Sequence, residues 1–283
     1  MSRGLFCEGQ RKIALSGGIA VSFQCWWGYQ RGEEIPIMPM IEELEGSGKW
    51  LFRWRSYLPL IFFVFVLASF GYFSYPFDSP FLDQLWELGC LLVGCFGQTI
   101  RALTASSVPR RTSGRNTEQQ VAETLNTTGM YSIVRNPLYL GNFFIGLAVA
   151  LFLRVWWLPM FYIPIFIIYY ERIIFAEEMF LRRKFADAYL EWAARTPAFF
   201  PRISQWRRPE LPLSFRTMIR REYQGFYGFV LSLFVLEEAG ELYMGHGWHI
   251  DTLWVWIMSV STCFYLVIRF LHKKTNVFHV DGR

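Results

Sequence analysis

The sequence predicts an all-α, polytopic membrane protein with about six transmembrane helices. Of its 283 residues, 53% are hydrophobic and 19% aromatic, whereas only 18% are charged. Soluble domains carry about 25% charged residues. Several apolar runs also approach the roughly 17–25 residues that cross a bilayer as a helix. The net charge of +5 is therefore interpreted as basic loops beside a membrane, and we predict no nucleic-acid partner.

The expected spans follow from these apolar runs. They lie at about 57–75, 82–103, 137–153, 156–170, 223–241 and 253–270. Pro137 suits a first helical turn, because its missing N–H has no helical partner there. Arg154 and Pro159 bracket a tight break, so the third and fourth spans form a hairpin. The fourth span is expected to continue beyond the membrane as a polar helix.

Three regions differ in composition. Residues 1–40 show no clear periodicity, and we expect a disordered or non-native extension there. Residues 41–203 are predicted to form the membrane core. Residues 204–283 are predicted to be a basic linker followed by two additional transmembrane helices. No cysteines have the spacing of a zinc site, and we predict no metal.

The distribution of basic residues predicts the orientation. Alternate connecting segments, at 49–56, 101–135, 171–222 and 269–283, together carry 23 lysines and arginines, and the three segments between them carry one. Basic residues collect on the cytoplasmic side of membrane proteins. We therefore expect a multi-pass protein of the bacterial inner membrane with both termini cytoplasmic, and a cofactor site on that same side.

Four polar patches converge on this side. They are GRN at 114–116, ETLNTTGMY at 123–131, RNPLYLG at 135–141 and AEEMFL at 176–181. Each alone has an ordinary explanation: a turn, a basic anchor at Arg135, or a solvated helix face at Glu177 and Glu178. Their order and spacing around one helical hairpin make the pattern specific.

The run TLNTTGMYSIVRNPLYLGN, the hairpin and then EEMFLRRKFADAYLEWAARTPAFFP resemble the isoprenylcysteine carboxyl methyltransferase family. They are more distantly similar to the phospholipid N-methyltransferases. The matching positions are Gly129, Tyr131, Arg135, Pro137, Tyr139, Glu177, Glu178, Leu181, Phe185, Tyr189 and Pro201. The resemblance covers roughly residues 85–203. Ala186 stands where the family has glycine, and Trp192 where it has the last aromatic residue.

The resemblance implies S-adenosylmethionine (SAM) as the methyl donor. The implied cofactor-binding residues are Asn116, Glu123, Thr124, Leu125, Asn126, Tyr131, Asn136, Pro137, Leu138, Tyr139 and Glu177. Arg135 and Glu177 are the predicted catalytic residues. Glu177 can accept hydrogen bonds from an ammonium or a ribose. Tyr131 and Tyr139 can place aromatic rings beside a cation. The planar guanidinium of Arg135 can bind an anion through two hydrogen bonds.

Two departures affect the expected acceptor. Asn136 replaces the family's histidine, so this position cannot titrate near neutrality. Ile173 stands where the prenylated-protein enzymes place an arginine, which puts a prenylcysteine substrate in doubt.

We therefore predict O-methylation of a lipid-like acceptor within the membrane, favouring a lipid phosphate, as in the bacterial lipid A 1-phosphate methyltransferase-like members that this chain resembles. Carboxyl methylation of a prenylated thiol is the first alternative, and phospholipid N-methylation the second. A non-catalytic membrane scaffold is the alternative of a different class. Glu237 and Glu238 are expected at the membrane interface beside Glu241, rather than in an ion pathway.

Overall fold

The computed structural model describes residues 40–55, 57, 59–72, 80–109, 122–243, 251–278 and 280. Its α-helices are α2 (Met40–Trp54), α3 (Pro59–Ser69), α4 (Pro80–Ser106), α5 (Pro137–Phe152), α6 (Trp157–Arg195), α7 (Phe215–Tyr243) and α8 (Thr252–Lys274). Within these ranges the β pairing is limited to one bridge between Gly129 and Arg207. The predicted all-α class is confirmed. The prediction for residues 1–40 lies outside the described residues, apart from Met40, which begins α2.

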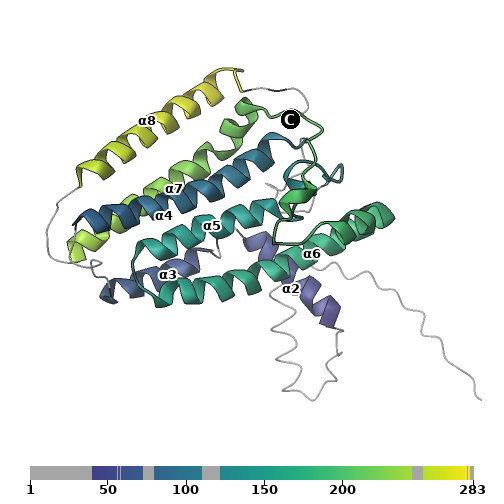
Figure 1. Cartoon of the computed structure of the whole chain (residues 1–283), viewed down its shortest axis with the longest axis horizontal. Coiled ribbons are helices and arrows are strands. Elements are labelled where there is room, and N and C mark those ends of the chain that lie inside the picture. Colours follow the sequence, from purple (N-terminus) through teal and green to yellow (C-terminus); the bar gives the residue numbers. More distant parts are fainter. Residues whose placement is uncertain are drawn as a thin grey trace, which may run out of the picture.

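The long helices run side by side as a bundle (Figure 1), with α4 between α5 and α7, α6 against α5, and α8 against α7. Two glycines of α4 allow close approach. A Cβ on Gly97 would lie 2.5 Å from the carbonyl oxygen of Gly141 on α5, and a Cβ on Gly94 would overlap the ring of Phe229 on α7. Small residues at such crossings are typical of membrane helices.

Three helical segments of the described chain are long and apolar enough to cross a membrane. They are Phe81–Ser106, Trp157–Arg195 and Thr252–Lys274. They correspond to the second, fourth and sixth predicted spans. The third is the shorter apolar helix α5. The first predicted span contains the shorter helix α3, and the fifth falls within α7. The protein is thus an all-α membrane protein, while the count of six spans stays a prediction.

Helix α6 is longer than a bilayer requires. At 1.5 Å per residue its 39 residues extend about 58 Å, against a hydrocarbon thickness of about 30 Å. The helix is apolar from Trp157 to Tyr170 and carries charges from Glu171 onward. We take the membrane-spanning part to end near Tyr170, and we call residues 171–195 the polar half of α6.

The polar half of α6 contains a strained residue. Ala186 has φ 44° and ψ −119°, inside an otherwise helical run. Glycine adopts positive φ readily, whereas a Cβ makes such a conformation unfavourable by about 1–3 kcal/mol. Ala186 stands where the resemblance places a glycine, so the backbone itself accounts for that family preference.

We expect Ala186→Gly to stabilise the protein by about 1 kcal/mol, because it relieves the strain at positive φ. Ala188→Gly is the matched control: it lies on the same helix with helical φ and ψ and an exposed side chain, and there glycine is unfavourable by about 1 kcal/mol. Thermal unfolding in one detergent measures both. A loss of stability in Ala186→Gly similar to that of the control would contradict the account.

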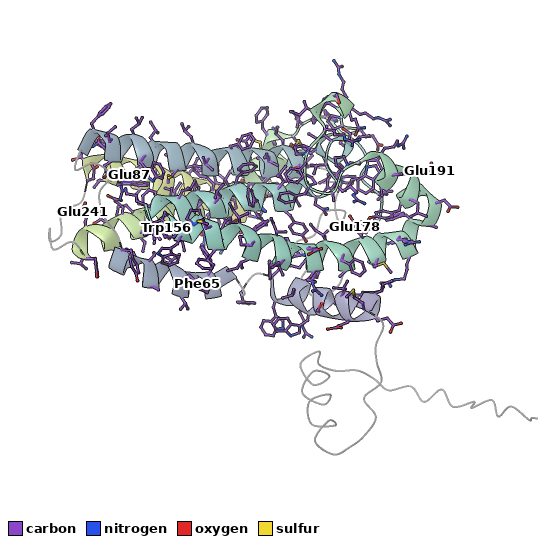
Figure 2. All side chains as sticks on the ribbon, turned by 60° about the horizontal axis from the view of Figure 1, so that its bottom comes forward. Phe65, Glu87, Trp156, Glu178, Glu191 and Glu241 are labelled. Carbon is purple, nitrogen blue, oxygen red and sulfur yellow. The ribbon has the colours of Figure 1, made fainter. Side chains whose placement is uncertain are left out.

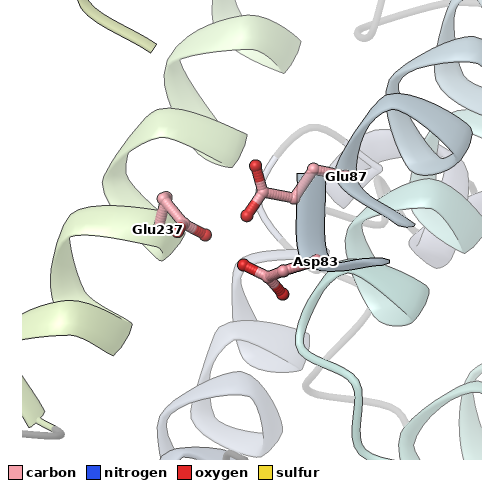
Figure 3. Close-up of side chains that lie close together, drawn as sticks. All are labelled: Asp83, Glu87 and Glu237. Atoms are coloured by element: carbon pink, nitrogen blue, oxygen red, sulfur yellow. The ribbon is translucent and has the colours of Figure 1, made fainter. Parts of the chain in front are cut away.

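At the far end of the bundle from the polar half of α6, charged side chains are buried together (Figures 2 and 3). Asp83 and Glu87 of α4 and Glu237 of α7 have carboxylate oxygens within 4.8 Å of one another. Nη2 of Arg154, in the α5–α6 turn, ion-pairs with Asp83 and lies 2.7 Å from Glu87 Oε1 and 3.9 Å from Glu237 Oε2.

Glu237 is only 5% exposed, so it is buried within the protein, and its expected depth at the membrane interface stays a prediction. Glu87 also accepts a hydrogen bond of 2.8 Å from Nε1 of Trp254 on α8. Arg154 itself adopts a positive φ of 59° in this turn. Its guanidinium carries five N–H donors, which suits several carboxylate partners. This acidic cluster and its arginine link α4, α7, α8 and the α5–α6 turn.

Candidate functional site

The loop before α5 is held against the chain that follows α6. Gly129 N–H donates to the carbonyl of Arg207 at 3.0 Å, and Ile133 O accepts from Arg202 N–H at 2.9 Å. The indole N–H of Trp192 donates to the carbonyl of Tyr131 at 3.0 Å. Gly129 has φ 61°, a conformation that favours glycine. These contacts position the loop beside the polar half of α6.

Arg135 lies at the end of this loop and points toward Glu178 on α6. Its backbone N–H donates to Pro197 O at 2.8 Å. Its Nη1 lies 3.3 Å from Glu178 Oε1 and 3.4 Å from Oε2. Glu178 Oε1 and Arg135 Nε are both buried and make no hydrogen bond of good geometry. A ligand could donate a hydrogen bond to Glu178 Oε1 and accept one from Arg135 Nε–H.

Glu177, the neighbour of Glu178, meets α5. The hydroxyl of Tyr139 donates to Glu177 Oε1 at 2.9 Å, and the ring of Tyr139 lies 4.6 Å from that of Tyr170. Pro137 starts the helix, so Tyr139 falls in its first turn, next to the free N–H groups of the helix start. Arg135, Tyr139 and Glu177 were all predicted site residues, and the structure brings them together with Glu178.

Burial shifts the acidity of both glutamates, which lie beyond the membrane-spanning part of α6. Desolvation raises the pKa of Glu177 from 4.5 to about 7, although the Tyr139 hydrogen bond and Arg55 act in the opposite direction. Desolvation also raises the pKa of Glu178, opposed by Arg135. Burial and the nearby Glu177 raise the pKa of Tyr131. Glu177 is thus a carboxyl group poised to change protonation near neutral pH.

Arg55 belongs to the same cluster and was missed from the sequence. It follows α2, and its Nη1 lies 3.8 Å from Glu177 Oε1. Helix α2 packs closely on α6: a Cβ on Gly48 would lie 2.1 Å from Arg172 O. Glu45 also pairs with Arg183 at 2.6 and 2.9 Å. The basic run KWLFRWR was visible, but nothing in it indicated packing against a helix more than 100 residues away.

The aromatic and charged contacts continue from this cluster to α7. The hydroxyl of Tyr170 accepts from Asn142 Nδ2 at 3.1 Å, and Asn142 Oδ1 accepts from Arg101 Nη1 at 2.6 Å. Arg101 then forms a two-point pair with Glu222 at 2.9 and 3.2 Å. Helices α4, α5, α6 and α7 therefore fix one another around the base of the site.

The remaining predicted residues differ in how the structure places them. Asn116 and the whole GRN patch fall outside the described residues. Glu123 and Thr124 are exposed, and Leu125 and Asn126 are half-buried. Asn136 Nδ2 donates to Ala198 O at 3.1 Å, so this amide anchors the chain after α6. Pro137 is buried and Leu138 half-buried.

The ion pairs of the site are looser than those elsewhere. Nη1 of Arg135 lies 3.3 Å from Glu178 and Nη1 of Arg55 lies 3.8 Å from Glu177, whereas Arg101–Glu222 and Arg183–Glu45 are two-point pairs with a contact of 2.9 Å or less. Loosely paired, partly buried charges can exchange partners with a charged ligand. Two arginines and two glutamates also suit a ligand that carries both an ammonium and a carboxylate, as SAM does.

A comparison with known protein families finds a match that includes the hairpin. Residues 86–188 match the family model of phospholipid methyltransferases. That segment contains Arg135, Tyr139, Glu177 and Glu178. It is the family that the sequence analysis gave as the more distant resemblance, and the narrower isoprenylcysteine assignment stays a prediction.

Two curated bacterial proteins are similar to parts of the chain. The nickel-cobalt-cadmium resistance protein NccN of Alcaligenes xylosoxydans xylosoxydans is 33% identical over 126 residues, 44% of this chain and 56% of that protein. The cobalt-zinc-cadmium resistance protein CzcN of Cupriavidus metallidurans is 31% identical over 143 residues, 50% of this chain and 62% of that protein. The matches thus span less than two thirds of either relative.

No solved structure matches the chain. The matched family model supports a membrane methyltransferase domain that contains most of α4, helix α5 and most of α6.

Proposed function

We propose that the protein is an integral-membrane, SAM-dependent O-methyltransferase acting on an anionic lipid, with a lipid phosphate as the favoured acceptor. The observation that carries this proposal is the cluster of Arg135, Glu177 and Glu178, with Tyr139 on Glu177, inside the segment that matches the phospholipid methyltransferase model. Bound SAM supplies an activated methyl group and leaves as S-adenosylhomocysteine.

Each residue has a role that its chemistry allows. Glu177 accepts hydrogen bonds from the ammonium or ribose of the donor, and Tyr139 orients that carboxylate. Arg135 holds a carboxylate through its guanidinium, with Glu178 keeping it in place. Tyr131 and Tyr139 provide aromatic surface beside a cation. An anionic acceptor oxygen is already nucleophilic, so the protein contributes alignment and partial exclusion of water rather than a general base.

The chemistry of the transfer favours an anionic acceptor over an amine. A protonated amine would need to lose a proton before it could accept a methyl group, whereas an anionic oxygen would not. The isoprenylcysteine alternative is weakened because Ile173, one turn before Glu177, is fully buried and apolar. We further propose that the polar half of α6 lies in the cytoplasm of a bacterium, beneath the inner membrane.

A panel of acceptors tests the proposal. The full-length protein, purified in detergent with lipid, is incubated with methyl-labelled SAM and one of three acceptors: phosphatidic acid, a prenylated cysteine or phosphatidylethanolamine. We expect label on phosphatidic acid or on an anionic lipid of a host extract, released as methanol on hydrolysis of the ester. Label only on the prenylated cysteine or only on the amine would favour the corresponding alternative. Binding of SAM without methyl transfer to any acceptor would favour the alternative of a non-catalytic membrane scaffold.

The affinity for SAM should depend on pH. Because Glu177 has a raised pKa of about 7, it is protonated at lower pH and must lose that proton before it can pair with a cation. We expect the dissociation constant to rise up to about tenfold per unit as pH falls below 7. Calorimetric titrations between pH 5.5 and 8.5 measure this, with Glu177→Gln as control. Equal pH slopes in both proteins would contradict a role for Glu177.

The names of NccN and CzcN describe metal resistance, and one feature here could relate to it. The acidic cluster of Asp83, Glu87 and Glu237 brings three carboxylates close together. Arg154 Nη2 already contacts all three residues, and Trp254 donates to Glu87. We infer a structural role for this cluster, in which the guanidinium supplies the counter-charge that a cation would otherwise provide.

A further inference from the structure

Helix α2 lies outside the segment matched by the family model, yet it reaches the candidate site. It runs beside the polar half of α6 (Figure 1), and Gly48 allows its backbone to approach Arg172 and Ala176. The Arg183–Glu45 pair fixes the same contact, and Lys49 lies 2.7 Å from Glu45. Because α2 is held at two separate points, the residue that follows it has a defined position.

That residue is Arg55. Its side chain is only 13% exposed, and its guanidinium carbon lies 4.0 Å from the centre of the Phe52 ring. Nη1 is 3.8 Å from Glu177 Oε1, the atom that also accepts the Tyr139 hydrogen bond. The guanidinium of Arg55 therefore faces Glu177, the residue that we propose binds the ammonium or ribose of SAM.

We propose that Arg55 binds the anionic head group of the methyl acceptor, a lipid phosphate; this inference rests on the proposed function. When Glu177 pairs with a cation of the donor, that cation competes with Arg55, whose Nη1 lies 3.8 Å from Glu177 Oε1. Arg55 then presents its donors next to the methyl-transfer site. Helix α6 offers no cation of its own one turn earlier, because Ile173 is buried and apolar.

The residues beside Arg55 are of the types that lie at the depth of lipid head groups. Trp54 and Tyr57 flank it and pack edge to face at 5.9 Å. Aromatic residues of this kind collect at the membrane–water interface. The amphipathic helix α2 precedes Arg55 and exposes Met40 and Ile41, whereas the apolar helix α3 follows. A lipid phosphate approaching from the side would meet Arg55 without leaving its own depth in the membrane.

Arg55 differs in this respect from Arg135. Arg135 is tied to the chain after α6 through its backbone and pairs with Glu178, so it serves the donor side of the cluster. Arg55 comes from α2 and approaches Glu177 instead. Loss of Arg55 should therefore affect the acceptor, whereas loss of Arg135 should affect the donor.

The test measures lipid binding and donor binding separately. The full-length protein, saturated with S-adenosylhomocysteine, is titrated with dihexanoyl phosphatidic acid, with dihexanoylglycerol as the lipid that lacks the phosphate. SAM affinity is measured by calorimetry on the same preparations. The variants are Arg55→Ala and Arg55→Lys, with Arg53→Ala as the matched control, because Arg53 is an exposed arginine of the same helix.

We expect Arg55→Ala to weaken phosphatidic acid binding by roughly tenfold to a hundredfold, the usual range for one hydrogen-bonded charge. Arg55→Lys, which keeps the charge without the planar fork, should lie between Arg55→Ala and wild type. SAM affinity should change by less than about threefold, and Arg53→Ala should behave as wild type. Intrinsic fluorescence on heating checks that each variant is folded; if Arg55→Ala is not, Arg55→Lys decides.

Three results would overturn the inference. Unchanged phosphatidic acid affinity in both Arg55 variants would remove the residue from the acceptor site. An equal loss of SAM affinity would make Arg55 a donor-binding residue instead. A wild-type protein that binds dihexanoylglycerol as tightly as phosphatidic acid would exclude a phosphate site. In each case methyl transfer by the wild-type protein to lipids of its host reports separately on the proposed function.

Discussion

Glu177→Ala and Arg135→Ala are each expected to reduce methyl transfer at least a hundredfold, while the protein still inserts into the membrane. Removing one member of a hydrogen-bonded, partly buried charge pair costs about 2–5 kcal/mol of binding or transition-state stabilisation. Glu177 supplies the acceptor atom for Tyr139 and the contact to Arg55, and Arg135 forms an ion pair with Glu178. Label transfer from methyl-labelled SAM to host lipids measures the effect.

The matched control is Glu191→Ala, since Glu191 is an exposed acid on the same polar half of α6 (Figure 2). It should retain wild-type transfer. Near wild-type turnover in Glu177→Ala or Arg135→Ala would remove that residue from the site. A similar loss in Glu191→Ala would show that the assay reports disturbance of α6 rather than loss of a specific contact.

The same glutamate should not be needed for stability. Burial raises the pKa of Glu177 from 4.5 to about 7, so the folded state binds this proton more tightly than the unfolded state does. Stability from this group is therefore present below pH 4.5 and is lost as pH rises through about 7. Glu177→Gln, which keeps a hydrogen-bond acceptor for Tyr139, should unfold at the same or a higher temperature at pH 8. A residue retained at the expense of stability is typical of a functional site.

Arg154→Ala is expected to destabilise the protein by about 3–5 kcal/mol, or to prevent folding. Removing the arginine leaves Asp83, Glu87 and Glu237 buried without its charge, and an uncompensated buried charge is strongly unfavourable. The exposed Arg195→Ala is the control and should change stability by about 0.5 kcal/mol or less. Thermal unfolding in detergent compares the two.

Two further variants separate the charge of Arg154 from its backbone. Arg154→Gly removes the guanidinium but suits the φ of 59°, so it should remain strongly destabilising. Adding Asp83→Asn and Glu87→Gln to Arg154→Ala removes two of the buried charges and should recover part of the loss. If Arg154→Gly is as stable as wild type, the residue matters only for the turn. If zinc restores Arg154→Ala, the acidic cluster is a cation site.

Much of this architecture follows from local pattern. Apolar runs of the right length predicted the helical class, and Pro137 predicted the start of α5 at the right residue. The register of one hairpin was enough to bring Tyr139 to Glu177 and Arg135 to Glu178, because the start of α5 and the continuation of α6 must lie at the same end. The positive φ of Ala186 was indicated only by the glycine of the resembling family.

Contacts between distant segments could not be predicted in this way. Arg55 reaches Glu177 because α2 packs on α6, a contact that depends on Gly48 and on the Arg183–Glu45 pair rather than on any periodicity. Likewise, no local signal in the sequence shows that α7 turns Glu237 toward Arg154. Pairings across more than 80 residues, such as these, become visible only when the helices are assembled.

The most direct test of the account is a calorimetric titration of the full-length protein with SAM at pH 8, in lipid nanodiscs, beside Glu177→Ala and Glu191→Ala. We predict one molecule bound per chain in the wild type and in Glu191→Ala, with binding at least tenfold weaker in Glu177→Ala. Absence of binding in the wild type, or equal affinity in all three proteins, would contradict the claim that Glu177 forms part of a methyl-donor site.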